Sequence, residues 1–190
     1  MRSKLVLAAL ITLLTLPVFS QVAPAVKIGG LPLGIGVGLS DYSIDYGFSR
    51  RMIGVSAWGE YNLFHGLGIE AEGTSIFADK PPRLTRMQQD TFKGGAVYKY
   101  HPIFGVRPYV KGILGIGSID FPSNNPSYTH DTYTVYAAGA GLEYKAWKTI
   151  YVRGDYEYQF WKDFQGPKYL NPNGFTIGAT YYLRGIHRHS

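Results

Sequence analysis

Ten ionisable side chains recur at alternate positions of segments that otherwise carry little charge. Alternate residues of an extended chain point to the same face, so these groups would share one side of a sheet. On an enclosed face they should pair, because an unpaired buried ion costs roughly several kcal/mol. They are Glu60, Glu70, Glu72, Lys93, Lys99, Lys111, Glu143, Arg153, Asp155 and Glu157. The pattern predicts a structural plug of ion pairs, and the alternative is an ion path that the same pairs gate.

A second group of charges lies in a segment that contains two prolines. Lys80, Arg83 and Arg86 surround Pro81 and Pro82. Proline favours turns and loops, and closely spaced cations bind phosphate or acidic sugars. The segment predicts a surface contact for anions, and a merely solvated loop is the alternative.

Histidines and a glycine-rich run are present, but their spacing does not match that of a catalytic or phosphate-binding site. The histidines are His65, His101, His130, His187 and His189. His130 has no suitably placed nucleophilic serine, and the two last histidines suit a solvated terminus better than a metal site. The glycine run 34–38 lacks the following helix and lysine of a phosphate loop. We therefore predict no catalytic residue, no metal site and no cofactor.

The elements that carry the charges show a period of two. Eight segments alternate apolar residues with glycine, hydroxyl or charged residues: 33–40, 53–63, 67–77, 92–100, 110–116, 135–144, 152–160 and 175–183. Such alternation indicates β-strands. Their lengths are close to the ~9–11 residues with which a tilted strand crosses a bilayer.

The connections between these segments take turns in length. Short ones are expected at 64–66, 102–106 and 145–149, and longer polar ones at 42–51, 79–90, 122–132 and 162–173. Outer-membrane barrels have short periplasmic turns and longer external loops. The alternation predicts an all-β, eight-stranded, antiparallel, up-and-down transmembrane barrel. A soluble barrel with an apolar interior is the alternative.

Aromatic residues favour the membrane barrel. On the apolar face, tyrosines gather toward one end of the strands (61, 98, 100, 144 and 181), and aromatic residues gather toward the other (77, 92, 158, 160 and 175). Paired aromatic girdles mark the two membrane interfaces of such barrels. The opposite face is crowded with glycine, serine and threonine, which suits a narrow interior.

The start of the chain resembles a secretory signal. Arg2 and Lys4 precede an apolar run over 5–18, with cleavage expected after Ser20 or as late as Ala25. The predicted organisation is a signal peptide over 1–20, a barrel over 26–184 and a tail over 185–190. Without the two leader cations the net charge of +6 falls to +4. The basic residues of the mature chain are dispersed along the sequence, so they predict no nucleic-acid surface.

The last strand resembles the C-terminal assembly signal of outer-membrane barrels. That signal combines polar, glycine, aromatic and hydrophobic positions, which Thr176, Gly178, Tyr181 and Leu183 match. The mature chain as a whole is similar to the small OmpA-type outer-membrane barrel domain, although it continues past this signal to Ser190. The resemblance implies location in the bacterial outer membrane, contact with its lipid and lipopolysaccharide, and insertion by the barrel assembly machinery.

For function we expect a non-enzymatic barrel with a structural or surface-interaction role and an unknown extracellular partner. A small passive channel for ions or solutes is the alternative. A lipid-modifying enzyme ranks third, since the His-x-Ser pattern of outer-membrane lipid A deacylases, which resemble this fold, is missing.

Counting from the short connections places most of the charges in the periplasmic half of the barrel interior. Lys93 would be the main cation of the outer half. The other inward residues there are small: Gly54, Ser56, Thr74, Gly115, Gly117 and Gly139. The sequence thus predicts a charged plug beneath a wet external cavity.

Overall fold

The computed structural model describes residues 33–44, 50–78, 87–120, 130–164 and 168–183. The predicted signal peptide, the tail over 185–190 and the cations Lys80, Arg83 and Arg86 lie outside these ranges. Within them, no helix is long and apolar enough to cross a membrane.

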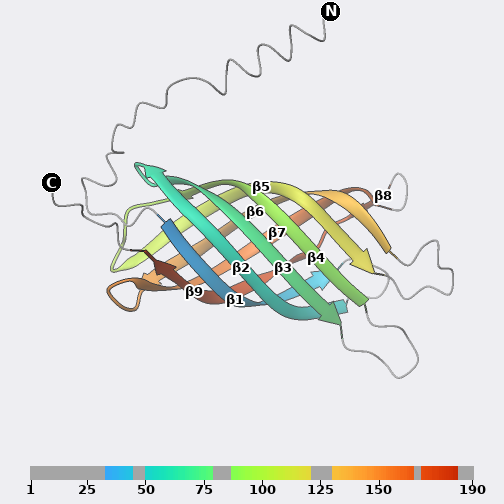
Figure 1. The fold of residues 1–190 in the computed structure, drawn as a ribbon, viewed down its shortest axis with the longest axis horizontal. Helices are drawn as coiled ribbons and strands as arrows, with labels where there is room; N and C mark the ends of the chain where they lie inside the picture. The colour runs from blue at the N-terminus through green and yellow to red at the C-terminus, as the bar shows by residue number, and fades with distance from the viewer. Residues whose placement is uncertain (1–32, 45–49, 79–86, 121–129, 165–167, 184–190) are drawn as a thin grey trace, which may run out of the picture.

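The chain forms a barrel of long, tilted strands (Figure 1). They are β1 (Leu33–Ile44), β2 (Arg50–Phe64), β3 (Leu67–Ala78), β4 (Met87–Lys99), β5 (Val106–Asp120), β6 (His130–Lys145), β7 (Ile150–Phe164), β8 (Lys168–Leu170) and β9 (Asn173–Tyr182). All pairings are antiparallel, in the order β6-β5-β4-β3-β2-β1-β9-β7, and a β6–β7 pairing closes the sheet. The short β8 adds only to β7, so the predicted eight-stranded barrel is confirmed.

The two faces of the strands differ as the alternation predicts. Val37, Leu39 and Ile177 point outward and are 64%, 69% and 67% exposed, whereas Ser56 and Thr180, which point inward, are buried. An exposed apolar wall of this extent is stable only against lipid. The alternation therefore describes a wall that is apolar outside and polar inside over most of its height.

Three tight connections join the strands at the end where β1 begins and β9 ends. They are residues 65–66, 100–105 and 146–149. The first is a two-residue turn in which His65 and Gly66 both have positive φ, 48° and 85°, and a Cβ at position 66 would lie 2.2 Å from the Lys99 carbonyl oxygen. Only glycine avoids that clash.

The opposite connections are shorter than the sequence suggests. The strands continue into the predicted loops, so that β1 ends at Ile44, β4 begins at Met87, β6 begins at His130 and β7 ends at Phe164. Only residues 45–49 separate β1 from β2, fewer than the six residues 100–105 at the other end. The alternation along the chain still holds, because 45–49 is longer than the adjacent turn 65–66 and is shorter only than the non-adjacent connection 100–105.

The polarity of the two faces is reversed at this external end. Outward positions become polar, as at Asp41, Asp90 and Thr132, while inward positions become apolar. The inward side chains form one buried cluster, which we call the external cap: Tyr42, Ile44, Met52, Ile76, Met87, Ile119, Tyr133, Val135, Trp161, Phe164 and Leu170. The reversal indicates that the strands extend beyond the lipid and enclose an apolar core of their own.

The external cap corrects the prediction of a wet external cavity. A Cβ at Gly117 would lie 2.4 Å from the Trp161 ring, so that ring fills the space above this glycine. Lys111 fills the space above Gly139 in the same way, at 2.9 Å. The small inward residues make room for large side chains of other strands.

Candidate functional site

The strand register brings the charged positions together inside the barrel. Glu60 is the register partner of Glu70 between β2 and β3, and Glu143 is the partner of Arg153 between β6 and β7. Glu72 faces Lys93 between β3 and β4. The structure buries all ten of the charged residues singled out from the sequence, and each lies in at least one ion pair within 4.0 Å. We call these ten residues the charged plug.

The lowest layer of the charged plug is centred on Lys99. Its Nζ donates to Glu60 Oε1 at 2.5 Å and to Glu143 Oε1 at 3.2 Å. The Tyr182 hydroxyl lies 2.5 Å from the same Nζ and contacts both carboxylates. Arg107, at the periplasmic rim, reaches Glu143 at 3.5 Å with a side chain that is 29% exposed. This layer lies at the periplasmic end of the interior, between the Arg107 rim and the Arg153 layer.

The next layer is organised by Arg153. Its guanidinium donates to both oxygens of Glu70, at 2.5 and 3.0 Å, and through Nε to Asp155 at 2.8 Å. Its carbon Cζ lies 4.6 Å from the ring centre of Trp58 and 4.8 Å from that of Tyr109. The two-pronged contact and the two rings fix the planar guanidinium in one orientation.

Two lysines form the upper layer. Lys111 Nζ donates to Glu72 at 2.5 Å and lies 3.0 Å from Glu157 Oε2 and 3.5 Å from Asp155. Lys93 shares Glu72, at 3.3 Å, and Glu157 with it. Lys93 therefore belongs to the same network as Lys111 and does not stand apart in an outer half of the interior, as the sequence analysis expected.

The charged plug contains more carboxylates than cations. Six carboxylates face four cations, and Arg107 at the rim adds one further cation, which contacts Glu143. Three buried carboxylate oxygens make no hydrogen bond: Glu60 Oε2, Asp155 Oδ1 and Glu157 Oε2. The last two lie within ion-pair distance of Lys111 without hydrogen-bond geometry. An opened interior would therefore attract cations.

Uncharged polar side chains lie between the charged plug and the external cap over part of the interior, while the hydroxyl of the cap residue Tyr42 reaches Glu157 directly, at 3.2 Å. Ser40 bonds Ser56 at 2.6 Å and Thr176 at 2.9 Å, and Ser56 bonds Thr74 at 2.8 Å. Above them, the Trp161 indole donates to Gln159 at 2.9 Å. The interior is thus filled in three layers, which are charged, hydroxylic and apolar.

Several residues of the interior escaped the sequence analysis. Tyr109 and Tyr182 donate to plug carboxylates, as does Tyr42, and Trp58 lies against Arg153. Only the alternation of each strand could have revealed them, because each occupies an inward position although its residue type is also that of the aromatic girdles.

The remaining candidates lie apart from the charged plug. Thr176 is buried in the hydroxyl layer and Gly178 faces inward, whereas Tyr181 and Leu183 are 49% and 38% exposed on the outer wall. The described histidines lie in turns or at strand ends, and no group of three or more metal-ligating side chains occurs among the described residues.

The fold and this filled interior define a class of protein, a small transmembrane β-barrel with polar residues inside and apolar residues outside. The outer membrane protein beta-barrel domain model matches residues 6–182, so the chain belongs to that family of the bacterial outer membrane. No curated protein sequence matches the chain.

Solved structures of the same architecture support the fold. Neisserial surface protein A superimposes with a TM-score of 0.65 at 13% identity, over 80% of this chain and 97% of that one. Ail, the attachment invasion locus protein of Yersinia pestis, gives 0.56 at 18% identity, over 79% and 97%. OprG of Pseudomonas aeruginosa gives 0.52 at 13% identity, over 80% and 96%. Such low identities show similarity of fold alone.

Proposed function

We propose that this protein is a closed, non-enzymatic barrel whose role is structural or lies in surface interaction. The observation that carries the proposal is the double closure of the interior by the charged plug and the external cap. An eight-stranded barrel is just wide enough for its own side chains, so two filled layers leave no continuous path for a solute.

The external end supports a role at the cell surface. There the strands carry polar outward residues and surround an apolar core, which makes the protruding rim a rigid support for the connections between strands. Binding residues are found disproportionately on loops that a rigid scaffold positions.

Single-protein conductance in a planar bilayer tests the proposal against the alternative of a small channel. The purified barrel should leave the bilayer current at its protein-free level. Steady, cation-selective current steps from the unmodified protein would contradict the closed barrel and favour the channel, since the interior has an excess of carboxylates. Turnover of lipid A by the same preparation would instead support the enzyme.

A further inference from the structure

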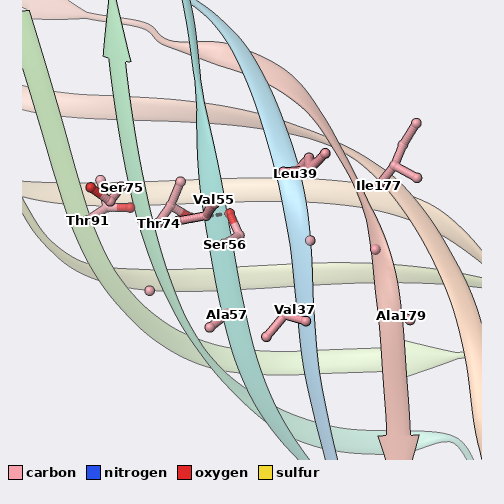
Figure 2. Close-up of a pocket in the computed structure, with 13 residues that line it drawn as sticks. Val37, Leu39, Val55, Ser56, Ala57, Thr74, Ser75, Thr91, Ile177 and Ala179 are labelled. Carbon is pink, nitrogen blue, oxygen red and sulfur yellow. Dashed lines mark hydrogen bonds between the residues drawn. The ribbon is translucent and has the colours of Figure 1, made fainter.

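A groove in the outer wall offers lipid no charged contact. It has a volume of about 850 Å³ and crosses the strands from β9 to β4 (Figure 2). The described residues that line it are aliphatic residues, glycines, serines and threonines, without a charged side chain. Charged side chains that could distinguish one lipid headgroup from another lie instead at the ends of the strands.

The periplasmic end of the barrel exposes charge of one sign. Its described residues are 61–69, 98–109, 142–152 and 180–183. Glu143 is the one carboxylate among them, and it is buried and paired with Lys99 at 3.2 Å. Lys145 and Lys148 are exposed, and the side chain of Arg107 is 29% exposed. This end therefore presents a positive surface.

The turn between β6 and β7 holds the two exposed lysines in a fixed frame. The Trp147 amide donates to the Ile150 carbonyl at 3.0 Å, and the Tyr182 amide donates to the Thr149 carbonyl at 2.8 Å. These bonds tie the turn to β7 and to β9. The large side chains that project from it are Lys145, Trp147 and Lys148.

This turn lies at the level of the lipid headgroups. Tyr144, the last outward residue of β6, is 54% exposed, and its register partner on β7 is the outward Val152. The headgroup layer on each side of a bilayer is roughly 5–8 Å thick, so a turn that begins directly after the apolar wall enters it. Trp147 is 70% exposed, and tryptophan is enriched at this interface.

A neighbouring turn adds a second exposed aromatic ring. Phe104 has a positive φ of 51° and is fully exposed. A Cβ at Gly105 would lie 3.7 Å from the Tyr144 ring, so the turn 100–105 lies beside the turn that carries the lysines. An aromatic ring suits the boundary between headgroups and acyl chains. The following residues together are called the periplasmic patch: Phe104, Tyr144, Lys145, Trp147 and Lys148.

We propose that the periplasmic patch binds the phosphate of an anionic phospholipid in the periplasmic leaflet. Lys145 and Lys148 donate to the phosphate oxygens, while the aromatic rings contact the glycerol and the upper acyl chains. A lysine near an anionic lipid surface strengthens binding about fivefold. A zwitterionic headgroup is disfavoured, because its ammonium group would lie beside the two lysines.

The proposal rests on the location in the outer membrane and not on the closed interior. A conducting barrel would carry the same turns, so the conductance experiment and the lipid experiment fail independently. An acidic segment of a periplasmic protein is the competing partner, because it would also complement the two lysines.

The fluorescence of Trp147 in vesicles tests the periplasmic patch. The other two tryptophans, Trp58 and Trp161, are buried inside the barrel, at 3% and 0% exposure. The vesicles contain equal amounts of phosphatidylglycerol and phosphatidylethanolamine with identical acyl chains. Bromine, a short-range quencher, is placed on the chains of one lipid at a time. The Trp147→Phe variant provides the signal of the two buried rings, which is subtracted.

We expect the quenching of Trp147 to be about twofold stronger or more when phosphatidylglycerol carries the bromine. The double variant Lys145→Gln with Lys148→Gln should give equal quenching by the two lipids, because glutamine removes the charge at similar length. Lys148→Gln alone should narrow the difference. Lys162→Gln is the matched control, since it removes an exposed lysine at the external end of β7, and it should leave the difference unchanged.

Three outcomes would overturn the proposal. Equal quenching by the two lipids in the unmodified protein would refute selection of an anionic headgroup. A difference that persists in the double variant would show that the lysines do not make the selection. Absence of quenching by either lipid would place Trp147 outside the bilayer and assign the periplasmic patch to an acidic protein partner.

Discussion

At the scale of single residues, Arg153 is a side chain whose contacts connect several strands of the interior. It holds Glu70 with two nitrogens and Asp155 with a third, between the rings of Trp58 and Tyr109. These partners come from β2, β3, β5 and β7. The side chain thus ties opposite walls of the barrel to one another.

Arg153→Met keeps much of the bulk and strands the carboxylates of Glu70 and Asp155. The loss of folding free energy should be about 3–5 kcal/mol, because a buried pair is broken from one side. Urea titration in lipid vesicles measures it. Lys162→Met is the control, since its 3.9 Å contact with Asp163 is largely exposed and such pairs contribute about 0–1 kcal/mol. Equal losses of folding free energy in the two variants would show that Arg153 does not stabilise the charged plug.

Lys93→Met should cost less than Arg153→Met. Both carboxylates that Lys93 contacts, Glu72 and Glu157, retain Lys111 at 2.5 and 3.0 Å. Without Arg153, the Glu70 carboxylate would have Lys111 as its ion-pair partner among the described residues, at 3.7 Å. The same urea titration compares the two variants, and a larger loss for Lys93→Met would show that the upper layer of the plug is the stronger one.

At the scale of elements, each strand passes through two environments. Its outward side chains face lipid over most of its length and water at the external end. Outward Val55 lies in the apolar part of β2, and outward Thr132 lies in the polar part of β6. Val55→Arg should cost about 2–4 kcal/mol near the membrane midplane, whereas Thr132→Arg should change stability by less than about 0.5 kcal/mol. Folding titrations into vesicles measure both. Similar costs would place Thr132 in lipid and move the external boundary of the membrane.

The last strand carries the proposed assembly signal. Tyr181 and Leu183 point outward, and the Leu183 amide donates to the Leu33 carbonyl at the seam of the barrel. Replacing both with serine should reduce insertion in cells more than the same change at Val37 and Leu39 on β1. Quantifying folded protein in isolated outer membranes compares the two double variants, and equal insertion would refute a special role for the last strand.

At the scale of the whole molecule, two chemically different layers fill the barrel interior, the charged plug and the external cap. Trp161→Ala removes a fully buried ring from the external cap and should cost about 3–5 kcal/mol. It should not create conductance, because the charged plug remains intact below. The double variant with Arg153→Met should conduct if it folds. Conductance from Trp161→Ala alone would show that the cap is the only seal.

The period of two was sufficient to predict the barrel, its lipid-facing wall and the inward positions of residues such as Glu70 and Arg153. It could not predict the external cap, because alternation is unchanged where water replaces lipid. Tyr42 and Ile44 keep their inward parity there, although the sequence placed both in the polar connection predicted over 42–51. The partners of each charge also depend on the stagger of distant strands, which no single segment encodes.

The external cap has a consequence for the response of the protein to temperature. Its side chains leave water when the barrel folds, so their contribution carries a large heat-capacity change and weakens on cooling. Side chains of the outer wall remain in lipid when the inserted barrel loosens locally, so their contact with water does not change. Cold should therefore loosen the rim before it loosens the wall, so the packing of the rim is the part of the barrel most sensitive to temperature.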